Sequence, residues 1–310
     1  MKPSTATLPG QQTAHERLCV ELESRRNADG GWGAGAGLES NAETTALACL
    51  ALAGRSAAPD ETGERWLADR QQSNGSWSYR AATPAATWPT PIVLLALLGR
   101  GQDRAVDAGF EWLVGLTGTG VSWRLRLREF LMGRQIVELD STLDGWPWVP
   151  GTFAWVEPTS WALLALKARW PESPPRPVQR RIREGERMIA DRACVDGGWN
   201  YGNKRVLGSD LPAFPDTTAL ALLGLRGART PVVESGFRAL DALLDAHASR
   251  LSLSLAVLSR RTWRRDWAGV RDRLAVRLES QPMPADTRTL AVAALAFARR
   301  IGWLEGTDHV

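Results

Sequence analysis

Three carboxylic acids stand where the sequence could support acid–base chemistry. Asp216 and Glu157 each open an apolar run, and Asp144 lies in a loop before Glu157. A helix N-terminus carries unpaired N–H groups and partial positive charge, so it suits an anion or a placed carboxylic acid. Asp216 is the first catalytic candidate, and Asp144 and Glu157 are weaker ones. The alternative is a helix cap, because Glu43 and Asp286 hold matching positions in other runs.

Aromatic residues gather in residues 118–156, the longest irregular segment of the chain. Trp146, Trp148, Phe153 and Trp155 could line an apolar pocket, where their π-faces would stabilise a cation. Trp146 also follows a glycine, as several other tryptophans do, so a structural role for it stays open. The chain has 15 Trp against 2 Tyr and 6 Phe, which suits either a repeated packing element or an aromatic cavity.

Arginines in the same segment raise the question of an anionic partner. Arg124, Arg126 and Arg128 could meet a diphosphate or an anionic membrane surface, or they could pair with nearby carboxylates. The net charge is only +4 and the arginines are spread along the chain, so nucleic-acid binding is not expected. Peripheral contact with a membrane stays open, and the oligomeric state is not predicted.

A polar stretch precedes the apolar run that Asp216 opens. Asn200, Tyr201 and Asn203 follow a Gly-Trp pair directly, and Asp210 and Phe214 come after them. Packing does not explain these residues. They are predicted to contact a ligand, or to act as turn residues.

Pairs of helices must position these side chains, and the pattern predicts six of them. The charged, amphipathic members are predicted at 11–25, 60–72, 103–116, 177–193, 232–246 and 267–278. Their apolar partners are predicted at 46–53, 89–98, 160–168, 217–225, 251–258 and 290–298. A repeat of about 50 residues indicates an array, and six pairs can close into a ring with the apolar helices inside. We therefore predict an all-α (α/α)6 toroid over 10–303, with a disordered 1–9 and a tail at 304–310.

The lengths of the connections indicate where a site would lie. Most links from an amphipathic to an apolar helix are long and carry Gly-Trp pairs, whereas the return links, such as 99–102 and 227–231, are short. In a closed ring all the long links fall on one face, beside the N-termini of the inner helices. The sequence therefore predicts a shared mouth on that face.

Two motifs of the sequence resemble those of a known superfamily. The segment 66–77, which ends in Gln-Gln-Ser-Asn-Gly-Ser-Trp, and Asp196-Gly-Gly-Trp199 are similar to the QW-type repeats of squalene and terpene cyclases and of protein prenyltransferase β-subunits. The resemblance covers about residues 10–303 and implies a stand-alone, single-domain member. Protonating cyclases carry Asp-x-Asp-Asp with the middle Asp as general acid. At residues 214–217 only that middle Asp, Asp216, is present.

The sequence lacks the residues that other chemistries of such toroids require. His15 and His247 fall on predicted outer helices, His309 in the tail, and Cys194 has no Cys or His nearby, so no metal or other cofactor is expected. An Asp-Asp-x-x-Asp motif and a Cys-Gly-Glu-Gln thioester element are missing from the sequence. The three cysteines are odd in number and far apart, and the start of the sequence lacks a signal-peptide pattern, so a cytoplasmic location is expected.

Two hypotheses about function follow. In the first, a terpene-cyclase-like protein holds an apolar isoprenoid ligand in the central cavity, and Asp216 starts a protonation-initiated cyclisation. In the second, the toroid is not catalytic and carries a lipid or small molecule, or binds another protein, having lost the acid motif. A scaffold subunit that requires a second chain is a further alternative, and it predicts a broad apolar patch outside the ring.

Overall fold

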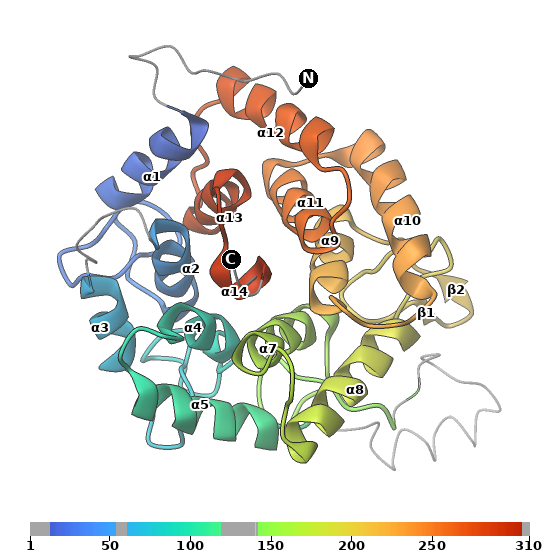
Figure 1. Ribbon diagram of the computed structural model, residues 1–310, viewed down its shortest axis with the longest axis horizontal. Coiled ribbons are helices and arrows are strands. Elements are labelled where there is room, and N and C mark those ends of the chain that lie inside the picture. The colour runs from blue at the N-terminus through green and yellow to red at the C-terminus, as the bar shows by residue number, and fades with distance from the viewer. Residues whose placement is uncertain (1–12, 54–60, 119–139, 141, 306–310) are drawn as a thin grey trace.

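The chain closes into a ring of helical hairpins in the computed structural model (Figure 1). The structure describes residues 13–53, 61–118, 140 and 142–305. The inner ring consists, in chain order, of α2 (Ala42–Leu52), α4 (Thr90–Leu97), α7 (Val156–Arg169), α9 (Pro215–Gly224), α11 (Arg250–Thr262) and α13 (Thr287–Phe297). Each inner helix packs against the next, and α13 packs against α2. The predicted (α/α)6 toroid is confirmed.

The outer ring surrounds these helices with amphipathic ones. It consists of α1 (Ala14–Ser24), α3 (Thr62–Ala68), α5 (Asp103–Gly115), α8 (Arg176–Asp191), α10 (Val232–His247) and α12 (Ala268–Ser280). On α8, Val178, Met188 and Ile189 are buried, while most of its charged side chains stay at the surface. The inner helix α4 is buried along its whole length. An apolar helix of this kind is stable only where protein surrounds it, which is why it occupies the inner ring.

Four tryptophans join the hairpins by one repeated arrangement. Each indole N–H donates to a carbonyl in the last turn of the preceding outer helix, at 2.7 or 2.8 Å, and each backbone N–H donates to a threonine hydroxyl of the following inner helix, at 2.9 Å. These tryptophans are Trp32, Trp77, Trp146 and Trp199. Each ring also lies against a glycine of the next outer helix, where a Cβ would come within 2.5 to 3.0 Å (Gly63, Gly109, Gly185 and Gly236). These rings therefore connect neighbouring repeats.

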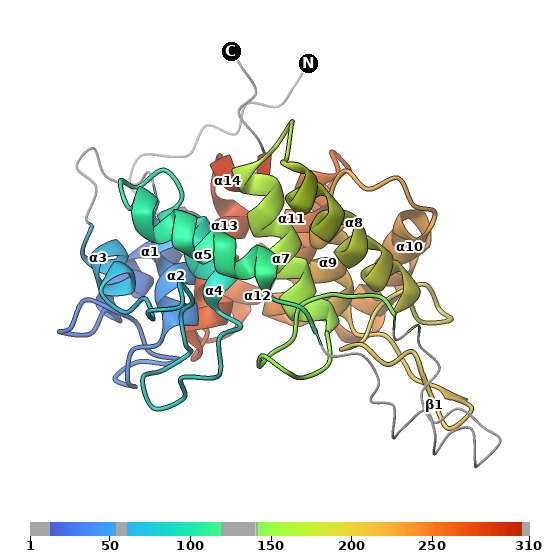
Figure 2. The ribbon, with the colours of Figure 1, turned by 90° about the horizontal axis from the view of Figure 1, so that it is seen from below.

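The two faces of the ring differ. The short helix α14 (Gly302–Glu305) lies over the centre of one face, where the Arg226 guanidinium donates to the Trp303 and Leu304 carbonyls at 2.9 Å (Figures 1 and 2). The long links and the hairpin of β1 (Arg205–Val206) and β2 (Ser209–Asp210) lie on the opposite face (Figure 2). We call the latter the loop face. Its existence agrees with the asymmetry of link lengths in the sequence.

The inner helices begin earlier than the apolar pattern predicts. α2 begins at Ala42 instead of residue 46, α7 at Val156 instead of 160, and α9 at Pro215 instead of 217. The extra turns include polar residues that are buried in α2 and α7, and local groups supply some of their partners: the Asn41 side chain, for example, accepts from the Thr44 N–H at 3.0 Å. Several acidic residues expected to cap these helices therefore lie inside the first turn. Among the described residues, no helix has the length and apolar character needed to cross a bilayer.

Candidate functional site

The second residue of each inner helix marks one layer of the ring at the loop face. Four of the six are charged: Glu43 on α2, Glu157 on α7, Asp216 on α9 and Arg288 on α13. Pro91 and Leu251 fill the other two positions. Because these residues hold the same place in equivalent helices, the ring brings them together although the sequence separates them widely.

Arg288 links two of the acids across the ring. Its Nη1 lies 3.4 Å from Glu43 Oε1, and its Nη2 donates to Glu157 Oε1. α13 is the neighbour of α2, but it is the sixth inner helix whereas α7 is the third, so the contact with Glu157 spans the ring from one side to the other. The two glutamate side chains are 9% and 11% exposed, and that of Arg288 is 27% exposed. We call Glu43, Glu157, Asp216 and Arg288 the axial cluster.

The axial cluster contains more negative than positive groups. Burial lowers the pKa of Arg288, but Glu157, Glu43 and Asp216 together raise it above the ordinary value for arginine. Burial raises the pKa of Glu43 to about 7, with further increases from Glu157 and Asp286 and an opposing effect from Arg288. Because Glu43 is buried and one guanidinium does not neutralise all of these carboxylates, Glu43 holds its proton to a higher pH than an ordinary glutamate does.

An apolar layer lies directly beneath the axial cluster. Residues four positions further along each inner helix share its face and sit one turn deeper. All six are 3% exposed or less: Leu47, Leu95, Trp161, Leu220, Leu255 and Val292. The buried Trp161 Nε1 has no hydrogen-bond partner among the described residues. The site is therefore a charged layer at the loop face above packed side chains.

Aromatic residues adjoin the Glu43 side of the cluster. Tyr79 stacks on Trp88 with ring centroids 5.4 Å apart, and Trp148 meets Trp88 edge-on at 5.0 Å. The Tyr79 carbonyl accepts from the Ala42 N–H at 3.1 Å, which places this group beside the start of α2. Burial raises the pKa of Tyr79, and the Glu43 charge raises it further. Trp148 thus belongs to an aromatic group next to the acid.

A second aromatic group lies near the starts of α7 and α9. Tyr201 and Phe214 have ring centroids 5.4 Å apart and remain 52% and 37% exposed. Trp155, the residue before α7, is half-buried against Gly202, whereas Phe153 is exposed. The Tyr201 carbonyl accepts from the Val156 N–H at 3.1 Å. These rings place exposed apolar surface beside the helix that carries Glu157.

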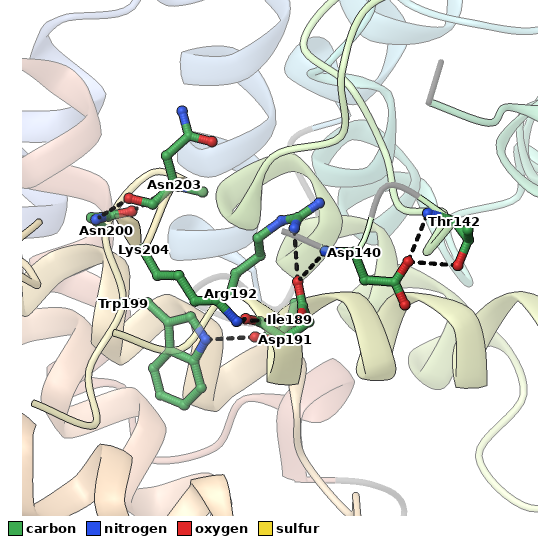
Figure 3. Close-up of polar contacts among 10 residues, drawn as sticks. Asp140, Thr142, Ile189, Asp191, Arg192, Trp199, Asn200, Asn203 and Lys204 are labelled. Carbon is green, nitrogen blue, oxygen red and sulfur yellow. Dashed lines mark hydrogen bonds and ion pairs between the residues drawn. The ribbon is translucent and has the colours of Figure 1, made fainter. Parts of the chain in front are cut away.

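Local structure accounts for the other polar candidates. Asn200 Oδ1 accepts from the Gly202 and Asn203 N–H groups at 3.0 and 3.1 Å, and its amide donates to the Asn203 carbonyl at 2.9 Å (Figure 3). Asp210 belongs to β2 and pairs with Arg205 at 3.5 Å. These contacts are local, and they leave both alternatives for the segment, ligand contacts or turn residues, as predictions.

Trp146 and Asp144 lie apart from the axial cluster. Trp146 is 1% exposed in one of the four repeated tryptophan positions, as the structural alternative had it. The Arg181 guanidinium lies 4.2 Å from the centre of its ring. Asp144 sits in the turn before it, and within the described part of the chain no contact links it to the cluster. Arg124, Arg126 and Arg128 lie outside the described residues.

Sequence reasoning found Asp216 and Glu157 but missed two members of the cluster. The sequence pattern indicates Glu43 only as a helix cap and gives no role to Arg288. The signal in the sequence is the position of these residues within the repeat. Three segments each form the start of an inner helix: Asn41-Ala42-Glu43, Phe214-Pro215-Asp216 and Asp286-Thr287-Arg288. Aligning the helix starts would have placed Glu43 and Arg288 beside Asp216.

Known proteins resemble this chain in fold. No protein-family model matches the sequence, and no curated protein does. The type II terpene cyclase MstE from Scytonema, solved as a variant with its product merosterolic acid A, is 13% identical with a TM-score of 0.54 over 90% of this chain and 94% of that chain. This likeness shows the α/α toroid fold.

Two larger proteins contain a similar region. The ent-copalyl diphosphate synthase of Streptomyces platensis is 19% identical with a TM-score of 0.47, over 90% of this chain and 45% of that chain. A variant of Salmonella alpha-2-macroglobulin is 13% identical with a TM-score of 0.49, over 92% of this chain and 17% of that chain. This chain thus spans less than half of the length of either protein.

Proposed function

We propose that the protein binds an apolar, isoprenoid-type ligand at the loop face and transfers a proton to it from Glu43, without a metal or another cofactor. The observation that carries the proposal is the convergence of Glu43, Glu157 and Arg288 in the first turns of three inner helices. The fold shared with MstE, which was solved with the isoprenoid product merosterolic acid A, supports the ligand class. The half-exposed rings of Trp148, Tyr201 and Phe214 supply the apolar contacts.

Glu43 replaces Asp216 as the first candidate for the acid. A carboxyl with a pKa of about 7 is roughly half protonated at pH 7, and a general acid acts best when its pKa lies near the pH at which it operates. Arg288 lies 3.4 Å away and would stabilise the carboxylate left after the transfer. Glu157 would hold Arg288 in place. Asp216 would contribute negative charge that stabilises a developing cation.

The same pKa favours a particular kind of acceptor. A carboxyl with a raised pKa gives up its proton less readily than an ordinary one, so protonating an oxygen is easier for it than protonating an unactivated double bond. We therefore favour an oxygen-bearing isoprenoid, such as an epoxide, over a plain hydrocarbon.

A non-catalytic toroid is the second candidate. Arg288 already contacts both glutamates, and the residues beneath the cluster are packed, so the cluster would also serve to hold the inner helices together. In that case the loop face would bind its ligand without changing it.

Turnover assays separate the two candidates. Wild type, Glu43→Gln and Asp216→Asn are incubated with squalene, squalene epoxide and geranylgeranyl diphosphate, and products are identified by mass spectrometry. Glu39→Gln is the matched control, because Glu39 is an exposed acid of the loop before α2. We expect conversion of the epoxide by wild type and the control and none by Glu43→Gln. Equal turnover in Glu43→Gln would exclude Glu43 as the acid, and binding without product in wild type would favour the carrier.

A further inference from the structure

The outer face of α8 carries a row of arginines that has no part in the axial cluster. Four exposed arginines follow one another at spacings of four, three and four residues: Arg176, Arg180, Arg183 and Arg187. Residues at these spacings share one face of a helix. The opposite face of α8 is buried against the ring, so this row points outward from the wall of the toroid (Figure 1). We call these four residues the arginine stripe.

The three acids of α8 are engaged by cations outside the arginine stripe. They form ion pairs at 2.7 or 2.8 Å with cations whose side chains are at most 12% exposed: Glu184 with Arg181, Glu186 with Lys167 and Asp191 with Arg192. Water and salt weaken sheltered ion pairs of this kind less than exposed ones. These acids therefore contribute little negative charge to the outer face of the helix.

Three of the four stripe arginines have no carboxylate to share their charge. Arg180 lies 3.5 Å from Glu184, so its charge is partly opposed, although its side chain is 72% exposed. The other three form no ion pair within the described part of the chain: Arg176, Arg183 and Arg187. The excess of positive charge on this face therefore does not depend on any arginine that is already paired.

Two acids outside α8 offset part of this charge at the ends of the stripe. Glu172, in the link before the helix, is exposed and has no ion-pair partner among the described residues. At the other end, hydrogen bonds from Thr142 lower the pKa of Asp140, and the charges of Arg192 and Arg187 lower it further. Asp140 and Arg187 form no ion pair with each other. Both acids act at the ends, so the middle of the stripe keeps its positive charge.

The excess of positive charge is only one helix wide. On the neighbouring α5, the exposed residues without an ion pair are two acids and one base: Asp103, Glu111 and Arg104. On α10, the other neighbour, the three exposed acids each pair with an arginine, and Arg238 is an exposed arginine without an ion pair among the described residues. A bilayer or a nucleic-acid duplex is wider than one helix and would bring its charges against the acids of α5. A narrow partner would meet the stripe alone.

We infer that the arginine stripe docks an acidic helical segment of another protein. The stripe is about 16 Å long, which corresponds to three turns of helix. A partner helix with carboxylates at positions i, i+4, i+7 and i+11 presents them at the same spacing, one for each arginine. Guanidinium groups bind carboxylates in a bidentate manner, which adds geometric selectivity to the attraction. The surface lies on the outer wall of the ring, so the inference does not rest on the function proposed for the loop face.

Fluorescence anisotropy tests this surface with two labelled, alanine-based peptides of about 18 residues, a length at which such peptides form helices. One carries glutamates at i, i+4, i+7 and i+11, and the other has the same composition with its glutamates spread around the helix. We expect the first to bind about tenfold more tightly at low salt, and its binding to weaken as salt rises.

Variants of the stripe locate the binding. Arg183→Gln and Arg187→Gln should each weaken binding of the first peptide about two- to fivefold, and the triple variant that adds Arg176→Gln should weaken it at least about tenfold. Arg238→Gln is the matched control, because it removes one exposed arginine without an ion pair from the next outer helix. It should leave binding nearly unchanged. Thermal unfolding curves establish that each variant is folded.

Four outcomes would overturn the inference. Equal binding of the two peptides would mean that net charge is recognised without regard to its arrangement. An equal loss in Arg238→Gln and Arg183→Gln would reduce the effect to diffuse charge. Tighter binding to a DNA duplex, or to vesicles that contain phosphatidylserine, would assign the surface to another class of partner. The absence of peptide binding at low salt would exclude the docking surface.

Discussion

Replacing Glu43 with glutamine should change the pH dependence of stability. Burial raises the pKa of Glu43 from 4.5 to about 7, so the folded protein holds a proton here that the unfolded chain has released. The stabilisation from this group is complete below the unfolded pKa and is lost as the pH rises through 7. The shift corresponds to at most about 3 kcal/mol. Glutamine resembles the protonated carboxyl and does not ionise, so the stability of Glu43→Gln should not fall in this way as the pH rises.

The expected result is a difference that grows with pH. Near pH 4, below the unfolded pKa of Glu43, the free energies of unfolding of wild type and Glu43→Gln should nearly coincide, and at pH 8.5 the variant should be the more stable, by up to about 3 kcal/mol. Urea unfolding, followed by circular dichroism between pH 4 and 8.5, measures this difference. Glu39→Gln serves again as the control. The Glu39 side chain is 69% exposed, so its replacement should have little effect at any pH.

Two results would refute this account of the site. A difference between Glu43→Gln and wild type that does not vary with pH would mean that Glu43 titrates as an ordinary acid. Destabilisation by Glu43→Gln at pH 8.5 would mean that the charged form pairs with Arg288 strongly enough to outweigh its burial. Carbon-13 NMR of the glutamate carboxyl groups gives an independent check, because the resonance lost in Glu43→Gln should titrate near pH 7 in wild type.

Two further predictions concern the cluster and the repeat. Glu157→Gln should lower the pKa of Glu43, because it removes a repelling charge and frees Arg288 from its contact with Glu157; the same NMR titration measures this, and an unchanged or higher value would contradict it. Gly236→Ala should destabilise the fold by about 1–3 kcal/mol in urea unfolding, since a Cβ there would come 2.5 Å from the Trp199 ring. Gly269→Ala, where nothing lies within 4 Å, should be neutral or slightly stabilising, and equal effects of the two changes would disprove the proposed packing.

Local patterns in the sequence were enough to predict the architecture. Charged and apolar helices alternate in six pairs, and a closed ring buries all six apolar helices at once. The Gly-Trp pairs indicated the repeat. A buried tryptophan needs a hydrogen-bond partner for its N–H and a neighbour to pack against, so a recurring Gly-Trp pair indicates a recurring structural unit. The same patterns indicate that Glu43 is only a cap. The apolar run marks the start of its helix after the polar residues, so Glu43 falls outside the predicted helix.

The sequence alone determined that this chain forms an α/α ring and that acids stand at the starts of its inner helices. It did not determine which of them meet. Glu157 and Arg288 are 131 residues apart, and their contact exists only because α7 and α13 face each other across the closed ring. Burial and charge balance in that shared layer, which no single segment contains, are what raise the pKa of Glu43.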